Sequence, residues 1–262
     1  MRHKAGQKGF ASGAPRSVSR KIGLARALSK LGLCSRSQAK ELLRARKVRL
    51  NGTVRRDPET PVYLGRDQLR IDGSPAVAAA KLYLMLNKPR GVVTSASDEK
   101  GRKTVYAFLQ PDLPWIAPVG RLDKASEGLL LLTNDSEWAA RVLAPDTHLE
   151  KVYHVQIASL PTESLLESLR RGVTTQGEVL RVARATILRT GQRNGWLEIV
   201  LDEGRNRHIR RMFDALGVET LRLVRIAIGP LPLGDLGKGK VRVLTPAEKL
   251  SIDRAMRSTR RN

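Results

Sequence analysis

The stretch GRLDKASEGLLLLTND, residues 120–135, joins a polar turn to an unbroken apolar run. A Gly-Arg turn delivers Leu122 and Asp123 just ahead of this run, which ends at Asn134 and Asp135. A short apolar run bounded by turn residues is typical of a strand buried on both faces. Two interpretations of Asp123 stay open at this point: it caps the turn, or it acts as a nucleophile or an anchor.

Around this stretch the sequence from residue 81 onward predicts strands and helices in a mixed order. Predicted strands outnumber helices without regular alternation, which favours an antiparallel or mixed sheet with helices packed on it over a doubly wound fold. The predicted strands lie within KLYLMLNKPRGVVTS (81–95), KVYHVQI (151–157), VARATILR (182–189) and GWLEIVL (195–201), and the predicted helices are TESLLESLRRGV (162–173) and RHIRRMFDALGV (207–218).

The N-terminal residues have a different pattern. Apolar residues at helical spacing within 22–45 predict two short helices, and VRLNGTV (48–54) carries an Asn-Gly signal for a hairpin. We therefore expect an α+β chain: a small helix-rich domain followed by a mixed, mainly antiparallel sheet domain flanked by helices. The expected parts are a disordered basic tail (1–18), the small domain (19–72), a linker (73–80), the sheet domain (81–250) and a basic C-terminal end (251–262). The tail is either a solvated leader or a phosphate-binding arm.

Charge is the first functional indication. The 262 residues carry 48 Lys and Arg against 25 Asp and Glu, a formal net charge of +23. A surface this basic favours a polyanionic partner, because each phosphate contact releases bound counterions. Aromatic residues make up only 4 %, which favours recognition of backbone and shape over base stacking. The single cysteine excludes a disulfide framework, and the lack of a long apolar run predicts a cytoplasmic protein outside the membrane.

A second cluster of unusual residues is EGRNRHIRRMFDALG, residues 203–217. Its arginines and its histidine open an amphipathic helix, whose N-terminus adds positive potential. One arginine could face a carboxylate while the others face phosphates; a solvated basic helix face is the competing interpretation. The histidines at 148, 154 and 208 are too scattered for a metal site, so no metal is expected.

The segment RALSKLGLCSRSQAKELLRARKVRLNG, residues 26–52, resembles the small S4-type RNA-binding domain found in ribosomal and RNA-modifying proteins. The resemblance implies that Arg26, Arg36 and Lys40 contact RNA; the alternative is a solvated helix face. Arg46 departs from the pattern, because the family usually has glycine after the second helix. This departure puts the geometry of that helix end in doubt.

The opening stretch, residues 120–135, closely resembles the catalytic motif of pseudouridine synthases. The surrounding motifs also follow the order of the RsuA-like branch, which modifies ribosomal RNA. The resemblance extends over about residues 20–250 and includes the S4-type domain. The supporting motifs are LNKPRGVVTS (86–95), EKVYHV (150–155), EGRNRHIRRMF (203–213) and LRLVRIAIGPLPLGDLGKGKVRVLT (221–245).

This resemblance implies a role for each matching residue. Asp123 corresponds to the catalytic aspartate, Tyr153 to the tyrosine that packs against the target base, and Arg210 to the basic residue that pairs with the aspartate. Arg121 and Leu122 form the loop around the aspartate and belong to the RNA-binding set. The other residues of the sheet domain expected to bind RNA are Lys88, Arg90, Arg205 and Arg207.

The chemistry implied by the resemblance suits these residue types. Pseudouridine forms when the bond from ribose to a uracil nitrogen breaks, the ring turns, and carbon 5 takes the place of the nitrogen. No outside group or redox change is needed, so no cofactor is expected. One carboxylate is required, either as a covalent nucleophile at the sugar or as a base that removes a sugar proton. The uridine must leave its stack to reach it, so base flipping is implied.

We therefore expect an enzyme that isomerises a specific uridine in ribosomal RNA, with large-subunit RNA slightly favoured. Its partner would be ribosomal RNA or a pre-ribosomal particle, and the protein would act as a monomer. The alternative from another class is a non-catalytic RNA-binding or ribosome-assembly factor with the same S4-type domain. A metal-dependent nuclease that uses paired carboxylates is a third and weaker alternative.

Overall fold

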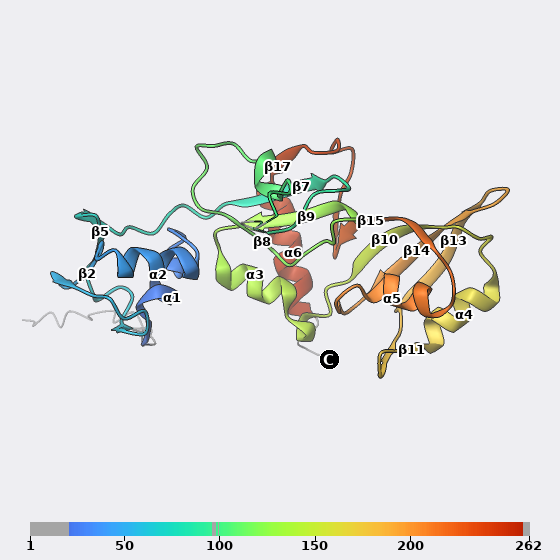
Figure 1. The fold of residues 1–262 in the computed structure, drawn as a ribbon, viewed down its shortest axis with the longest axis horizontal. Helices are drawn as coiled ribbons and strands as arrows, with labels where there is room; N and C mark the ends of the chain where they lie inside the picture. Colours follow the sequence, from blue (N-terminus) through green and yellow to red (C-terminus); the bar gives the residue numbers. More distant parts are fainter. Residues whose placement is uncertain (1–20, 96–97, 99, 259–262) are drawn as a thin grey trace, which may run out of the picture. The chain divides into compact units, whose positions relative to one another are not determined.

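The computed structural model describes residues 21–95, 98 and 100–258 (Figure 1). The chain divides into two compact units. The first comprises the residues up to Ala27 together with Ser37–Ala76, and the second comprises Leu28–Arg36 and the residues from Val77 onward. The expected basic tail, 1–18, and residues 259–262 lie outside the described residues.

The N-terminal elements are two helices and several short strands. The helices α1 (Leu24–Lys30) and α2 (Arg36–Arg44) form where the apolar spacing predicts them. The predicted hairpin is confirmed: Asn51 and Gly52 both have positive φ, 51° and 83°, as a two-residue hairpin turn requires. The strands are β1 (Ile22–Gly23), β2 (Val48–Leu50), β3 (Thr53–Val54), β4 (Pro61–Val62), β5 (Leu69–Ile71) and β6 (Ser74–Pro75), with β1 paired to β4 and the others in the order β3-β2-β5-β6.

Two details of this part answer questions that the sequence left open. Arg46 has a φ of 59°, the left-handed conformation that glycine adopts most freely. The helix end therefore keeps a glycine-type geometry although the residue is arginine. The expected linker, 73–80, is wrong at its start, because Ser74 and Pro75 pair with β5 and belong to the small sheet.

The second unit contains a nine-stranded sheet in the order β13-β14-β10-β15-β9-β7-β17, with β16 paired to β15 and β8 to β9. Its pairs are antiparallel except for β15 with β9. The predicted α+β class with a mainly antiparallel sheet is confirmed. The strands are β7 (Tyr83–Lys88), β8 (Ala117–Pro118), β9 (Glu127–Thr133), β10 (Lys151–Ile157), β13 (Arg184–Thr190), β14 (Gly195–Leu201), β15 (Thr220–Ile228), β16 (Leu231–Pro232) and β17 (Val241–Val243), and a separate hairpin joins β11 (Val173–Thr175) to β12 (Glu178–Leu180).

The apolar run of the opening stretch forms β9, and every residue of β9 is buried. Leu129 and Leu131 pack into the apolar cluster that contains Trp138 of α3 (Ser136–Leu143) and residues of α6 (Pro246–Ser258). Leu130 and Leu132 belong to the opposite cluster, with residues of α4 (Glu163–Arg171) and α5 (His208–Ala215). Figure 1 shows these helix pairs at the two ends of the sheet. The predicted burial on both faces is thus confirmed.

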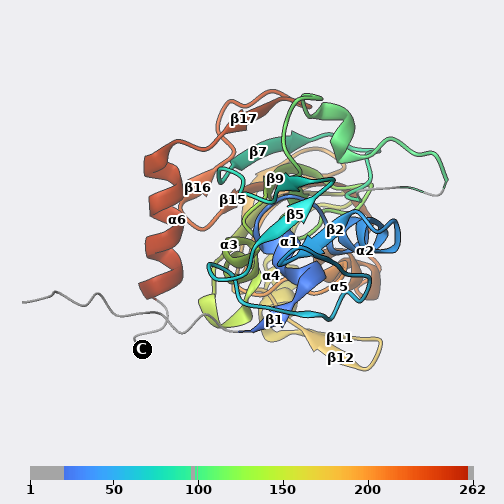
Figure 2. The same ribbon diagram turned by 90° about the vertical axis from the view of Figure 1, so that its left-hand side faces the viewer.

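The C-terminal end differs from expectation. Helix α6 continues to Ser258 and contacts β16 (Figure 2), so the first part of the expected basic C-terminal end, 251–262, belongs to a helix of the sheet domain. The reason is that Ile252 and Met256 are buried in the core beneath it. Short helices η1 (Val105–Phe108) and η2 (Pro145–Thr147) complete the elements of the unit.

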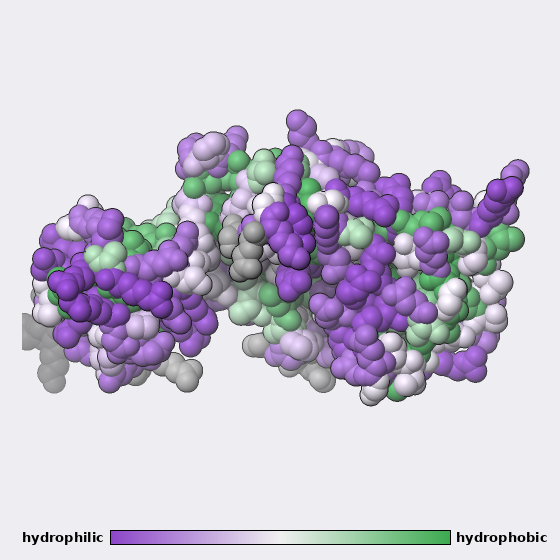
Figure 3. Space-filling model, in the orientation of Figure 1, coloured by the Kyte–Doolittle hydropathy of each residue, from purple (hydrophilic) through white to green (hydrophobic). Residues whose placement is uncertain are grey.

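Hydrophilic side chains cover much of the face drawn in Figure 3, in keeping with the charge of the sequence. Within the part of the chain that the structure describes, no helix combines the length and apolar character that a membrane span needs.

We predict that Gly128→Ala lowers the free energy of unfolding by about 3 kcal/mol or more. Gly128 has a φ of 99°, and an added Cβ would lie 2.2 Å from the carbonyl oxygen of Arg225, its partner on β15. Gly177→Ala is the matched control, because its φ of 76° is also positive but open space surrounds it. Urea unfolding of both variants separates backbone strain from the clash; equal losses would contradict the close approach of β9 to β15.

Candidate active site

A cavity of about 360 Å³ opens in the second unit, at the loop that precedes β9. Such a volume suits one small ligand or nucleotide. Most of its wall comes from two loops and two strands. The loops are the one with Asp123 and the one that leads into α5, and the strands are the neighbours β10 and β15. The lining residues include Arg121, Leu122, Asp123, Ser126, Lys151, Tyr153, Arg205, Asn206, Arg207, His208, Leu223 and Arg225. The cavity therefore combines one carboxylate with several cations.

A buried lysine, Lys88, binds the backbone of the loop that carries Asp123. Lys88 Nζ donates to the carbonyl oxygens of Pro89 at 3.1 Å, Asp123 at 3.1 Å and Ser126 at 2.8 Å. Burial lowers the pKa of Lys88 to about 8, although the charges of Asp123 and Glu127 oppose this shift. The expectation that Lys88 binds RNA is wrong, because its side chain is 0 % exposed. It acts instead as a fixed donor that shapes the loop.

The residue before Asp123, Leu122, is held by Thr94. The Thr94 hydroxyl donates to the carbonyl oxygen of Leu122 at 2.8 Å and accepts from its N–H at 3.4 Å. Leu122 is buried in the apolar core, so its contribution to the cavity is wall and not a polar contact with RNA. Arg121 is exposed at the mouth, as a residue that meets RNA must be.

Tyr153 lies on the cavity wall, on β10, with 9 % of its surface exposed. The alternation of KVYHVQI places Lys151 and Tyr153 on one face of the strand. The register partner of Tyr153 on β15 is Arg225. An aromatic face beside the carboxylate is available to pack against a planar base.

Arg210 is buried beneath the loop and does not form the expected ion pair. Its Nη2 donates to the carbonyl oxygen of Ala125 at 3.1 Å and its Nη1 to that of Thr220 at 3.4 Å. Among the described residues no ion pair joins Arg210 to Asp123. Burial and the charge of Arg207 lower the pKa of Arg210, and the charge of Asp123 opposes that shift. Instead of the ion pair with Asp123 that the sequence predicts, Arg210 donates a hydrogen bond to the backbone carbonyl oxygen of Ala125, two residues after Asp123.

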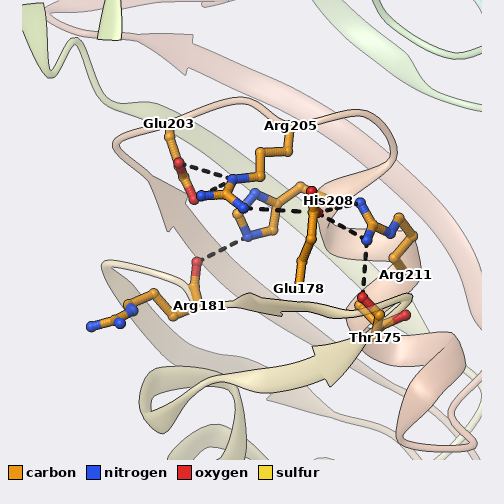
Figure 4. A network of polar contacts seen from close by, with 7 residues as sticks. All are labelled: Thr175, Glu178, Arg181, Glu203, Arg205, His208 and Arg211. Atoms are coloured by element: carbon orange, nitrogen blue, oxygen red, sulfur yellow. Dashed lines mark hydrogen bonds and ion pairs between the residues drawn. The ribbon is translucent and has the colours of Figure 1, made fainter. Parts of the chain in front are cut away.

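The loop before α5 is tied down by an ion-pair network (Figure 4). Arg205 lies 3.2 Å from Glu203 and 3.7 Å from Glu178, and Arg211 contacts Glu178 at 3.1 Å. His208 is buried, and its Nε2 lies 3.0 Å from the carbonyl oxygen of Arg181. Burial lowers the pKa of His208. These contacts hold Arg205 at the edge of the cavity and place a buried histidine in its wall.

The remaining candidates are exposed arginines and a lysine, and of these Arg207 lines the cavity. Arg26, Arg36 and Lys40 are exposed on α1 and α2. Arg90 is exposed as well, and its Nη1 donates to the carbonyl oxygen of Leu221 at 3.3 Å. Arg207 is exposed at the cavity wall, 4.0 Å from Asp214.

Two cationic residues of the cavity, Lys151 and Arg225, escaped the sequence analysis. The alternation in KVYHVQI contains the signal for Lys151, since it shares a face with Tyr153. Arg225 has no such signal, because only the pairing of β15 with β10 and β9 brings it to the cavity. In the described ranges, no group of three His, Cys, Asp or Glu side chains could hold a metal ion.

Comparison with known proteins agrees with this geometry. A family model described as RNA pseudouridylate synthase matches residues 82–215, and a model of the S4 domain matches residues 22–66. The chain is 37 % identical over 227 residues to the ribosomal large subunit pseudouridine synthase B of Bacillus subtilis, covering 86 % of this chain and 93 % of that protein. It is 36 % identical to an uncharacterized RNA pseudouridine synthase of Aquifex aeolicus, covering 87 % and 92 %. A crystal structure of a pseudouridylate synthase superimposes with a TM-score of 0.63 at 30 % identity, over 88 % of this chain and 99 % of the other.

Proposed function

The chain belongs to the RNA pseudouridylate synthase family, and from this premise we propose that it converts one uridine of large-subunit ribosomal RNA to pseudouridine with Asp123 as the catalytic carboxylate. The observation that carries this assignment is that Asp123, Tyr153 and several cationic side chains line one cavity. The name of the Bacillus subtilis relative supports the choice of the large subunit. The net charge of +23 supports a ribosomal RNA or pre-ribosomal partner.

The cavity explains how the reaction would proceed. A uridine that leaves its stack enters the cavity with its ring against Tyr153 and its ribose at Asp123. The carboxylate either attacks C1′ or removes the proton from C2′, and in both routes the bond between C1′ and N1 breaks. Because Lys88, Thr94 and Arg210 fix the backbone of the loop, the Asp123 carboxylate is already positioned when the sugar arrives. No free energy is then needed to order the loop during the reaction.

The exposed arginines and lysines would guide the RNA. We assign Arg26, Arg36 and Lys40 to docking, since they are exposed in the segment that matches the S4 domain. Arg121, Arg205 and Arg207 would contact the strand around the flipped nucleotide. This proposal includes action as a monomer in the cytoplasm, with the small domain extended through Pro75 and the sheet domain through Ser258.

The direct test is to incubate the purified protein with unmodified transcripts of large-subunit and small-subunit ribosomal RNA and to map pseudouridine in both. We expect one modified position, in the large-subunit transcript. Modification confined to the small-subunit transcript would support the pseudouridine synthase activity but contradict the large-subunit target. Binding of RNA without any pseudouridine would favour the alternative function, a non-catalytic RNA-binding or assembly factor.

We expect Arg210→Ala to slow the single-turnover reaction by roughly 100-fold while RNA affinity changes little. The substitution removes the donor to the carbonyl oxygen of Ala125 and a cation that interacts with Asp123. The Asp123 carboxylate is then less precisely oriented toward the sugar. Arg207→Ala is the matched control, because it removes an exposed arginine of the same segment. The control should weaken binding and keep the rate at saturation. The opposite pattern, weak binding by Arg210→Ala at an unchanged rate, would make Arg210 a phosphate contact.

A further inference from the structure

The mechanism above leaves two cations of the cavity without a role. Arg225 is 6 % exposed; its Nε donates to the carbonyl oxygen of Leu129 at 2.7 Å. Its Nη2 is buried and has no hydrogen-bond acceptor among the described residues. Lys151 lines the same cavity. Burial lowers the pKa of Lys151, the charge of Arg225 lowers it further, and Asp202 opposes the shift.

Two neighbouring cations in a partly closed cavity repel each other. A buried guanidinium nitrogen without an acceptor, such as Nη2 of Arg225, is costly, so this arrangement calls for an anion or a strong acceptor in the working state. In the described part of the chain, neither Arg225 nor Lys151 forms an ion pair within 4.0 Å. The missing negative group must therefore come with the substrate.

The position of the cations identifies the part of the substrate that they meet. Arg225 is the register partner of Tyr153 on the adjacent strand, and Lys151 precedes Tyr153 by two residues on the same face. Both cations therefore flank the ring that we assign to stacking on the uracil. Arg225 is also too deeply buried to meet the backbone of the incoming RNA at the surface.

The reaction creates a negative charge at this place. When the bond between C1′ and N1 breaks, its electron pair goes to N1, and the uracil becomes an anion whose charge spreads to O2 and O4. This is true whether Asp123 attacks C1′ or removes the proton from C2′. The charge is discharged when C5 forms its bond to C1′. In the attack route the bond between Asp123 and C1′ breaks at this step and the carboxylate leaves, and in the other route Asp123 returns the proton to C2′. C5 then loses its proton and N1 gains one.

We propose that Arg225, supported by Lys151, binds a carbonyl oxygen of the flipped uracil and stabilises the uracil anion while it is detached from the sugar. This inference rests on the proposed function. It also gives a basis for the choice of base, because O4 of uracil accepts a hydrogen bond where cytosine presents an amino donor. Preorganised donors aimed at developing charge are among the strongest catalytic devices of enzymes.

The experiment combines changes in the protein with changes in the substrate. Single-turnover rates at saturating enzyme are measured for the wild type and Arg225→Gln, on RNA that carries uridine, 2-thiouridine or 4-thiouridine at the mapped target. We expect Arg225→Gln to slow the reaction on uridine roughly 100-fold at nearly constant RNA affinity. Sulfur at the contacted oxygen, a weaker acceptor, should slow the wild type and add little to the variant, because one interaction cannot be lost twice. The thiouridine that shows this non-additivity identifies O2 or O4.

Controls keep the outcomes separate. Arg225→Lys retains the charge and should recover part of the rate, and Arg254→Gln removes an exposed arginine of α6 and should change nothing. If Arg225→Gln does not fold, Lys151→Gln carries the same coupling test. Additive effects with both thiouridines, or weaker RNA binding at an unchanged saturated rate, would overturn the inference. A wild type that forms no pseudouridine would instead refute the proposed function itself.

Discussion

Asp123→Asn is expected to abolish pseudouridine formation, with a loss of at least about 10⁴-fold in the single-turnover rate. Asparagine keeps the shape of the side chain, but it can neither attack C1′ nor accept the proton of C2′. The loop should keep its conformation, because Lys88 and Thr94 bind its backbone and not the carboxylate. The free energy of unfolding should therefore stay within about 1 kcal/mol of the wild type.

RNA binding by Asp123→Asn should be unchanged or slightly tighter, since one negative charge leaves a basic cavity. Asp135→Asn is the matched control from the same stretch of sequence. Asp135 caps α3 by accepting from the N–H of Trp138, a role that asparagine performs equally well. The control should be fully active. A rate near the wild type for Asp123→Asn would return Asp123 to the role of a turn cap.

Lys88→Met is expected to slow catalysis by roughly 100-fold and to lower the free energy of unfolding by about 1–3 kcal/mol. The substitution leaves the carbonyl oxygens of Pro89, Asp123 and Ser126 without their shared donor. The loop can then shift, and a displacement of about 1 Å at the reacting carboxylate costs on the order of 100-fold. RNA affinity should not change, because the side chain does not reach the surface.

The dependence of stability on pH gives a second measurement for Lys88. Its pKa falls from the ordinary value of 10.5 to about 8 in the folded protein, so between these values the unfolded chain binds more protons. Stability from this group therefore rises as pH increases from about 8 to about 10.5, and Lys88→Met should lack this rise. Lys124→Met, which changes an exposed lysine beside Asp123, should keep the rise. Weaker RNA binding by Lys88→Met at a normal rate would contradict the loop-shaping role.

The strands around the site were predictable from local pattern. The apolar run of 120–135 becomes β9 with both faces buried, and the alternation of KVYHVQI becomes β10 with Tyr153 turned to the interior. Helices α4 and α5 also form where their apolar spacing predicts them. Helix α3 was missed, because only Trp138 and Val142 mark its buried face within a short polar segment.

The roles of the buried cations were not predictable in the same way. Lys88 follows an apolar strand and precedes a Pro-Arg-Gly turn, which indicates a surface lysine, yet β9 and its loop cover it completely. Arg210 stands in a helix rich in arginine, and its sequence does not tell which of these arginines turns inward toward Ala125.

The sequence by itself determined the α+β class, the buried strand that follows Asp123, the face of β10 that carries Tyr153, and the family to which the chain belongs. The fold class and the strands follow from the spacing of apolar and polar residues within single segments, which backbone geometry converts into buried and exposed faces. The family follows instead from the resemblance of whole motifs, such as residues 120–135 and 203–213. Only the tertiary structure decided that Lys88 shapes the loop, that Arg210 grips backbone carbonyls, and that Arg225 faces Tyr153. The physical reason is that the burial and partners of a charged side chain depend on strands distant in sequence, and pairing such as that of β15 with β9 leaves no periodic trace in either segment.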